Sequence, residues 1–233
     1  MLEETMRAGL DAMGLPWDAE TLPRFRLYYT LLQETNAVMN LTAISGEEET
    51  ARLHFLDSLA PLLRFSMEGA SAIDVGSGAG FPGLPLKLLS PSLSLTLLDS
   101  QRKRTEFLQR VCDTLALTEV RCVHARAEDC GTERERYDFA LSRAVARLPM
   151  LCELCLPFVR PGGRFLALKG PAAPQEAAEA RRAISLLGGE LEDIFAYDIP
   201  GAELRHTVVV VRKTSPTPAK YPRPFGQIKK SPL

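Results

Sequence analysis

One glycine-rich turn in this sequence has the residue types and the spacing of a nucleotide-binding loop. It reads AIDVGSGAGFPGLPLKLL between Ala72 and Leu89 and joins a strand-like apolar run to a helix-like one. Glycines permit positive φ and a close approach of a ligand to the backbone, and the next helix offers free N–H groups. Two kinds of site fit. Residues 78–83, GAGFPG, match the GxGxxG of dinucleotide enzymes, whereas residues 74–80, DVGSGAG, match the acidic-x-GxGxG loop of S-adenosylmethionine enzymes.

The acidic residue at the start of the turn favours the second kind of site. Asp74 ends the strand-like run, two residues before Gly76. A carboxylate there suits the positively charged amino acid end of S-adenosylmethionine, while a dinucleotide site must receive a negatively charged pyrophosphate. We therefore predict an S-adenosylmethionine loop containing Gly76, Gly78 and Gly80. The alternative is a plain strand-to-helix turn in which Asp74 accepts a local hydrogen bond.

Two later strand ends carry residues that suit a nucleoside. Asp99 closes LTLLDS about twenty residues beyond the glycines, where a carboxylate can accept both ribose hydroxyls, although it or Ser100 would serve equally as a helix N-cap. In HARAEDCG, Ala127 and Glu128 would lie beside an adenine ring and accept from its amine, or Glu128 would merely cap a turn. Both cofactor classes use such positions, so they support nucleoside binding without choosing between the cofactors.

Parallel strands must bring these positions to one edge of a sheet. The chain alternates strand-like runs with amphipathic stretches from Ser71 onward, which predicts a parallel sheet covered on both faces. GELEDIFAYDIP and LRHTVVVVRK lie too close together for a crossover helix, so we expect an antiparallel hairpin at the end of the sheet. The fold class predicted is α/β: a Rossmann-like, class I methyltransferase sheet of seven mostly parallel strands.

Three segments follow from this pattern. Residues 1–66 repeat apolar side chains at helical spacing and predict a helical N-terminal segment, and residues 67–213 form the predicted methyltransferase domain. Residues 214–233 hold five prolines and no acidic residue, which predicts a basic tail without regular structure.

Composition places the chain among ordinary globular proteins. It has 233 residues, 45% of them hydrophobic, a formal net charge of −1 and five cysteines. The acidic start lacks the features of a secretory signal, and no apolar run approaches the roughly 18 residues that span a bilayer. We therefore expect a cytoplasmic protein with free thiols and no metal, and favour a monomer. Cys152 and Cys155 lie in an apolar helical run, so two core residues are expected there rather than a redox or metal pair.

Several further segments resemble the RsmG family, also called GidB. The resemblance runs from about Asn40 to Lys213 and rests on these segments: NLTAI, RLHFLDSL, DVGSGAGFPGLPL, LLDSQRKRTEFL, RAED, LSRAVA and GGRFLALKG. The tail is similar to the YPRxPGxPxKxPL ending of many members, with Phe225 where proline is usual. The resemblance implies transfer of a methyl group from S-adenosylmethionine to N7 of a guanine, at position 527 in the usual numbering, in the decoding-region loop of bacterial 16S rRNA. It places the cofactor contacts on Gly76, Phe81, Ala127, Glu128 and Arg143.

The segment after the fourth predicted strand agrees with that product. It reads LSRAVA and lacks both the Pro-Cys and the (Asn/Asp)-Pro-Pro-(Tyr/Phe) patterns typical of methylation at base carbons and exocyclic amines. Guanine N7 has no proton to lose, so in-line transfer needs positioning more than a general base. Arg143 is the positioning candidate, for the cofactor in preference to the guanine edge, and a salt bridge to a carboxylate is its structural alternative. His54 and Asp57, three apart on a predicted helix, would orient each other and the loop, contact RNA, or form a purely structural pair.

Three groups of basic residues are candidates for contact with RNA. They comprise Arg102 to Arg104, Arg143 with Arg147, and a C-terminal group of Lys213, Lys220, Arg223, Lys229 and Lys230. The first two groups follow predicted strands at the cofactor edge, where they would hold phosphates of 16S rRNA within a ribosomal particle or precursor, and the tail would fold onto the RNA. A solvated surface is the alternative for each cluster. Two other functions remain open: methylation of a small molecule or protein, and an NAD-dependent oxidoreductase or nucleotide sensor.

Overall fold

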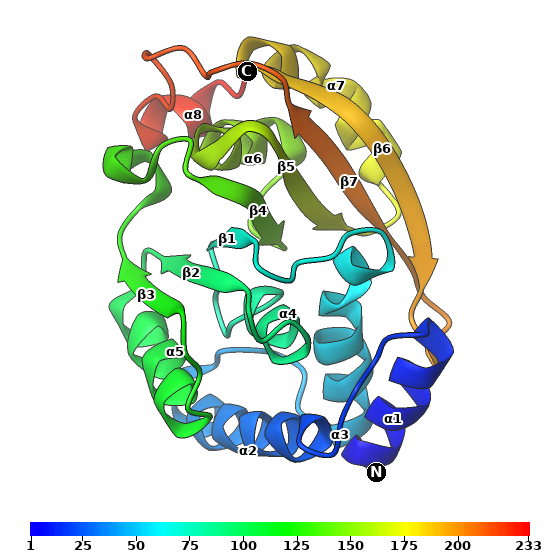
Figure 1. Cartoon of the computed structure of the whole chain (residues 1–233). Coiled ribbons are helices and arrows are strands. Elements are labelled where there is room, and N and C mark those ends of the chain that lie inside the picture. The colour runs from blue at the N-terminus through cyan, green and yellow to red at the C-terminus, as the bar shows by residue number, and fades with distance from the viewer.

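The valine run near the end of the chain shows how the central sheet is buried. Val208 and Val210 belong to the apolar core on one face of the sheet, and Val209 and Val211 to the core on the other. Because strand side chains alternate between faces, an unbroken apolar run fits a strand that is covered on both sides. The computed structural model describes all residues, 1–233, and contains such a doubly covered sheet (Figure 1).

The sheet has seven strands in the order β3-β2-β1-β4-β5-β7-β6. Its strands are β1 (Ser71–Val75), β2 (Ser94–Asp99), β3 (Val120–His124), β4 (Tyr137–Arg143), β5 (Val159–Lys169), β6 (Gly189–Asp198) and β7 (Arg205–Lys213). The first five pair in parallel, whereas β7 is antiparallel to both β5 and β6. The predicted mostly parallel sheet with a terminal antiparallel hairpin is confirmed.

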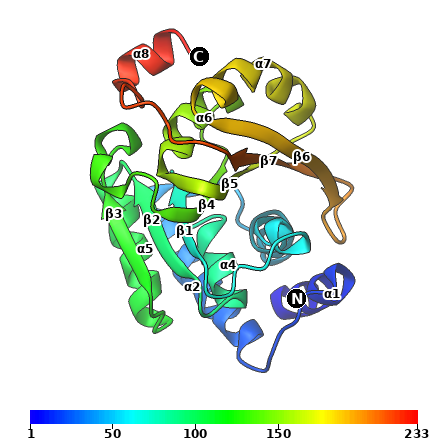
Figure 2. The same ribbon diagram turned by 45° about the horizontal axis from the view of Figure 1, so that its top comes forward.

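Helices cover both faces of the sheet (Figure 2). They are α1 (Leu2–Met13), α2 (Thr21–Met39), α3 (Glu47–Thr50), α4 (Gly83–Leu89), α5 (Arg102–Thr114), α6 (Leu148–Cys155), α7 (Ala173–Leu186) and α8 (Phe225–Lys230). Side chains of α1, α2, α4 and α5 share one core with the sheet, and those of α6, α7 and α8 share the other. The helical N-terminal segment is therefore confirmed, and it packs directly into the core of the sheet.

The prediction for the C-terminal tail is wrong. The chain after β7 turns back over α6 and forms the short helix α8, in which Ile228 is fully buried. The Arg134 guanidinium donates to the carbonyl oxygens of Pro218 and Tyr221, at 3.1 and 2.7 Å. The composition of the tail predicts no regular structure, but the chain forms a helix there and contacts with distant residues hold it in place.

One edge of the sheet is irregular. β6 forms that edge, and its pairing with β7 shifts in register between Leu191 and Asp193. Three exposed carboxylates flank this bulge: Glu190, Glu192 and Asp193.

Candidate functional site

The predicted glycine turn lies where the strand order reverses. β1 has β2 on one side and β4 on the other, and a ligand site is expected outside the carboxyl ends of the strands at such a switch point. A cavity of about 370 Å³ opens there and is lined by five of the predicted residues: Gly76, Gly78, Phe81, Asp99 and Arg143. The sheet thus brings together residues from β1, β2 and β4 that are far apart in the sequence.

The glycines of the turn have different structural roles. At Gly78, which lines the cavity, φ is 59° and an added Cβ would meet only the Gly76 carbonyl oxygen at 3.9 Å, so the backbone conformation rather than crowding favours glycine. At Gly80, an added Cβ would collide with the Tyr28 hydroxyl and the Leu84 side chain. Gly80 therefore serves packing against α2, and Gly76 and Gly78 are the glycines that face the cavity.

The expectation that Asp74 faces the cofactor is not met. Its side chain is fully buried, and Oδ2 accepts a hydrogen bond from the Gly83 N–H at 2.9 Å, while Oδ1 has no partner. Burial raises the pKa of Asp74 to about 7, against the lowering effect of the Gly83 hydrogen bond. Asp74 therefore stabilises the start of α4 through the Gly83 N–H. This is the role that the alternative interpretation, a plain strand-to-helix turn, gives to Asp74.

Asp99 lines the cavity and also binds backbone N–H groups of the two segments beside it. Its Oδ2 accepts from the Gly78 N–H at 2.9 Å, and its Oδ1 accepts from the Gln101 N–H at 2.8 Å. Arg104 Nη1 also lies 3.6 Å from Oδ2, and since a carboxylate has about four lone-pair positions, Oδ1 retains acceptor capacity. Asp99 therefore caps the start of α5 and can still accept a hydrogen bond from a ligand.

Ala127 and Glu128 line a neighbouring cavity of about 160 Å³. It shares Gly76 with the first cavity, so the two lie side by side along the sheet edge. The tail contributes Phe225 to its wall, and the Arg126 guanidinium lies 5.4 Å from the centre of that ring. Sequence reasoning missed Phe225, because nothing in the tail indicates that it returns to this edge.

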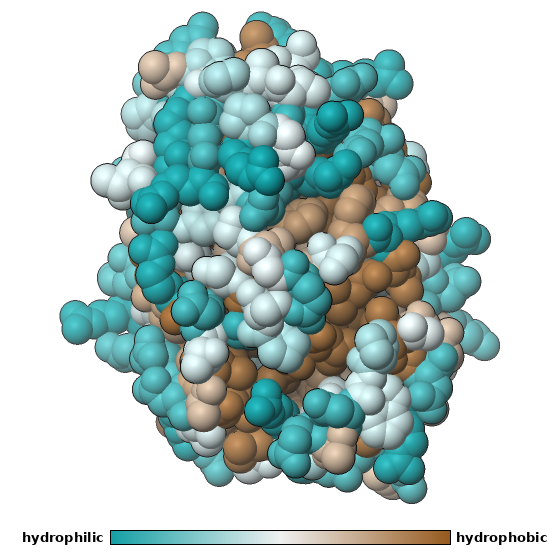
Figure 3. Space-filling view, in the orientation of Figure 1, coloured by the Kyte–Doolittle hydropathy of each residue, from teal (hydrophilic) through white to brown (hydrophobic).

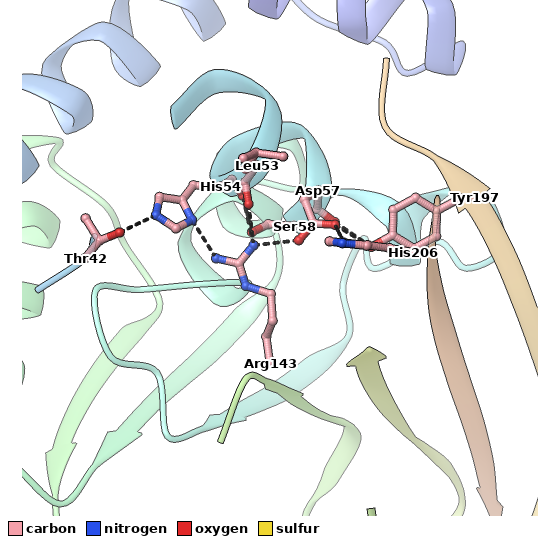
Figure 4. A network of polar contacts seen from close by, with 8 residues as sticks. All are labelled: Thr42, Leu53, His54, Asp57, Ser58, Arg143, Tyr197 and His206. Carbon is pink, nitrogen blue, oxygen red and sulfur yellow. Dashed lines mark hydrogen bonds and ion pairs between the residues drawn. The ribbon is translucent and has the colours of Figure 1, made fainter. Parts of the chain in front are cut away.

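Arg143 is the centre of a buried polar network (Figure 4). Its Nη1 donates to Asp57 Oδ2 at 2.7 Å and to the Leu53 carbonyl at 3.1 Å. Its guanidinium also lies 4.9 Å from the centre of the Phe81 ring. The salt bridge to a carboxylate, given as the structural alternative for Arg143, is therefore present, and it fixes the residue at the border of the cavity.

His54 is held as a neutral imidazole by its surroundings. Its Nδ1 lies 3.2 Å from Arg143 Nη2, which has only protons to offer, so Nδ1 accepts and Nε2 donates to Thr42 Oγ1 at 2.7 Å. Burial, together with the charge of Arg143, lowers the pKa of His54 to about 3. The ring also stacks on Phe81 with centroids 4.5 Å apart. His54 and Asp57 are thus oriented through Arg143 and form no direct hydrogen bond.

Asp57 receives two more donors that sequence reasoning missed. The Tyr197 hydroxyl and His206 Nδ1 lie 2.6 and 2.8 Å from its Oδ1. Burial alone would raise the pKa of Asp57, but the His206 hydrogen bond and the Arg143 charge hold it below its ordinary value. Tyr197 and His206 come from β6 and β7, and only the pairing of the hairpin with β5 brings them here.

The helical segment before the sheet shapes this network. Residues Ala51–Leu56 form a π-helix, a rare element that recurs at functional sites. It places the Leu53 and His54 carbonyls and the Asp57 side chain around one guanidinium. The apolar repeat of the sequence predicts a helix here, but not this wider winding.

The basic clusters are only partly available to a partner. Lys213 is fully buried and donates to the Leu156 carbonyl at 2.8 Å, and the half-buried Arg223 pairs with the buried Glu153, so both are already engaged within the protein. Arg102 and Arg147 each pair with a glutamate on the surface. The cationic residues that are exposed and make no ion pair in these clusters are Lys103, Lys220, Lys229 and Lys230.

The remaining predictions concern cysteines, metals and membranes. Cys152 and Cys155 are fully buried on α6, as predicted for core residues, and all five cysteines are free. The structure contains no group of three or more His, Cys, Asp or Glu side chains placed to hold a metal ion. None of its helices combines the length and apolar character needed to cross a bilayer.

Comparison with known proteins gives a family match across most of the chain. Residues 21–204 match the family model described as GidB, rRNA small subunit methyltransferase G. The ribosomal RNA small subunit methyltransferase G of Acetivibrio thermocellus is 43% identical over 235 residues, covering 100% of this chain and 97% of its own. That of Pelotomaculum thermopropionicum is 45% identical, covering 100% and 99%.

Solved structures share the fold at low sequence identity. M. jannaschii TYW2, solved in complex with AdoMet, gives a TM-score of 0.55 at 15% identity and covers 67% of this chain and 74% of its own. TrmN from Thermus thermophilus gives 0.53 at 21% identity and covers 68% and 48%. The predicted class I methyltransferase fold is confirmed.

Proposed function

Since the chain belongs to the GidB family of rRNA small subunit methyltransferases G, we propose that it moves the methyl group of S-adenosylmethionine to N7 of a guanine in the decoding-region loop of 16S rRNA. The observation that carries this proposal is the row of residues along the carboxyl edge of the sheet. It runs from Ala127 and Glu128 through Asp99 and Gly78 to Arg143.

The two adjoining cavities fit the two ends of S-adenosylmethionine. Asp99 is placed to accept the ribose hydroxyls, and Ala127 and Glu128 border the narrower cavity suited to adenine. Gly76 and Gly78 border the cavity where the amino acid part would lie. When bound, the cofactor supplies a methyl group on a positively charged sulfur.

Arg143 and His54 suit a reaction that needs positioning rather than proton transfer. Arg143 is fixed by Asp57 and the Leu53 carbonyl, and it lines the cavity with the neutral His54. Guanine N7 offers an in-plane lone pair and loses no proton on methylation, so no side chain needs to accept one. Rigid placement of the acceptor beside the cofactor therefore supplies the main catalytic contribution.

Methylation of 16S rRNA at guanine N7 is tested directly with labelled cofactor. The protein is incubated with S-adenosylmethionine labelled in the methyl group and with small ribosomal subunits, naked 16S rRNA or DNA. The recovered RNA is then treated with borohydride and aniline, which cleave at N7-methylguanine. We expect label in 16S rRNA and cleavage at one guanine. Labelled RNA that resists cleavage would contradict the N7 assignment, and label in protein or small molecules would favour another acceptor.

The cofactor site is tested at Asp99 by calorimetry. Asp99→Ala is expected to weaken S-adenosylmethionine binding by roughly 1–3 kcal/mol, the cost of losing hydrogen bonds to a buried carboxylate. Glu106→Gln, which changes an exposed carboxylate on α5, is the matched control. Unchanged affinity with a lowered melting temperature would leave Asp99 only its capping role, and tighter binding of NAD by the wild type would contradict the cofactor assignment.

A further inference from the structure

A second cavity adjoins the glycine loop on the far side of Arg143. Its volume is about 310 Å³, at the low end of the range for small-ligand sites. It shares Arg143, His54 and Ala144 with the glycine-loop cavity, so the two spaces meet at a common wall. The space-filling view shows apolar side chains gathered over the gap between β5, β7 and the helical segment that precedes the sheet (Figure 3).

His206 is the polar group of this cavity with a free hydrogen-bonding atom. Its Nδ1 donates to Asp57 Oδ1 at 2.8 Å, which leaves Nε2 without a protein partner. The side chain is 28% exposed and lines the cavity. Asp57 accepts from Arg143, Tyr197 and His206, and so orients the imidazole.

Lys169 provides a second donor at the same cavity. Its Nζ donates to the Ala146 carbonyl at 2.6 Å and to Glu176 Oε2 at 2.8 Å. An ammonium group has three protons, so one remains. The side chain is 9% exposed, which holds this donor at the cavity wall. The His206 imidazole and the Lys169 ammonium therefore line one cavity together with apolar side chains.

We propose that this cavity receives the base to be methylated and that His206, with Lys169, recognises guanine through its O6 atom. This inference rests on the proposed function and names the acceptor side of the same site. In the major-groove edge of guanine, O6 and N7 are both acceptors, whereas adenine presents an amino donor in place of O6. Donors at His206 and Lys169 match guanine and oppose adenine. The apolar walls, Leu53 and Leu168 among them, would contact the ring.

The donor state of His206 depends on its neighbours. The hydrogen bond to Asp57 raises the pKa of His206 above its ordinary value, so the protonated form, with Nε2–H as donor, persists to higher pH. The other charged or titratable groups around it are Arg143 on β4, Lys169 on β5, Tyr197 on β6 and His54 on the π-helix. Base recognition should therefore weaken as pH rises through the pKa of His206.

The test compares His206→Ala and His206→Gln with the wild type on small ribosomal subunits. The control is Glu106→Gln, which changes an exposed carboxylate on α5 that lines neither cavity. We expect His206→Ala to lower kcat/KM for methylation roughly ten- to a hundredfold, the value of one charge-assisted hydrogen bond, with S-adenosylmethionine affinity unchanged within twofold. His206→Gln keeps an amide donor and should retain more activity, without the loss at high pH. Wild-type kcat/KM for His206→Ala, or an equal loss in Glu106→Gln, would overturn the proposal.

Failure of the proposed function can be distinguished from failure of the His206 assignment. A wild-type protein that methylates no rRNA at N7 contradicts that function, whatever the variants do. The cavity is then tested by adding guanosine 5′-monophosphate or adenosine 5′-monophosphate and following the His206 imidazole resonances by NMR. We expect a shift with the guanine nucleotide and a smaller one with the adenine nucleotide. No difference between them would overturn the assignment of His206 to O6.

Discussion

Asp74 and Asp99 end neighbouring strands but lie in opposite environments. Asp74 is fully buried with an unpartnered Oδ1, whereas Asp99 lines a cavity and accepts two backbone hydrogen bonds. The sequence predicts that both residues stand at strand ends, because the apolar runs before them are clear. The direction of Asp74 depends on the N–H of Gly83, nine residues later in the chain, and no local pattern reveals it.

The buried carboxyl of Asp74 should give the protein a measurable pH dependence. Its pKa is about 7 in the folded chain and near 3.8 when unfolded, so the stability it contributes is present below about pH 4 and is lost as pH rises through 7. Asp74→Asn removes this titration. As pH rises from 4 to 8, we expect the free energy of unfolding of the variant to increase by roughly 1–4 kcal/mol relative to that of the wild type, as measured by urea unfolding.

A matched variant separates this effect from general charge effects. Glu106→Gln changes a carboxylate that is 64% exposed and should leave the pH profile unchanged. A difference between Asp74→Asn and wild type that stays constant with pH would mean that Asp74 titrates normally in the fold.

The C-terminal tail shows how an element gains order from a distant partner. Arg223 donates from Nε and Nη2 to the two oxygens of Glu153, a fully buried residue of α6. The tail's prolines and lysines predict a segment without regular structure because composition reports only local preference. The partner that orders the tail lies 70 residues earlier, so the tail's own sequence carries no sign of it.

Replacing Arg223 should destabilise the whole protein and not only the tail. Arg223→Ala leaves Glu153 as an unpaired buried carboxylate, a change that typically costs about 3–5 kcal/mol. We expect a lower urea midpoint and faster proteolysis near Lys220. Lys229→Ala, on the exposed side of α8, serves as the control and should behave as wild type. Equal stability of the two variants would show that the tail is held by its apolar contacts instead.

At the scale of the whole molecule, the N-terminal helices and the glycine turn form one unit. Tyr28 of α2 is fully buried and its hydroxyl donates to the Ala79 carbonyl of the glycine turn at 2.5 Å. Its ring also packs near Phe81, with centroids 5.7 Å apart. The sequence predicts the helical segment and the turn separately, but their contact requires the folded arrangement.

Tyr28→Phe should therefore affect both stability and cofactor binding. It leaves the Ala79 carbonyl without its partner, which costs roughly 1–3 kcal/mol in a buried setting. We expect a lower free energy of unfolding and weaker S-adenosylmethionine binding by calorimetry. Tyr29→Phe removes a comparable hydrogen bond to the exposed Ser45 carbonyl and is the control. A stability loss without any change in affinity would show that the loop keeps its shape without α2.

The irregular edge at β6 also bears on how copies of this chain behave at high concentration. An open strand edge is a template on which a second molecule can extend the sheet, the first step of β-aggregation. Here the bulge between Leu191 and Asp193 interrupts the row of backbone groups, and the exposed carboxylates of Glu190 and Asp193 repel an identical edge. The sheet therefore stops at β6 and is protected against edge-to-edge growth.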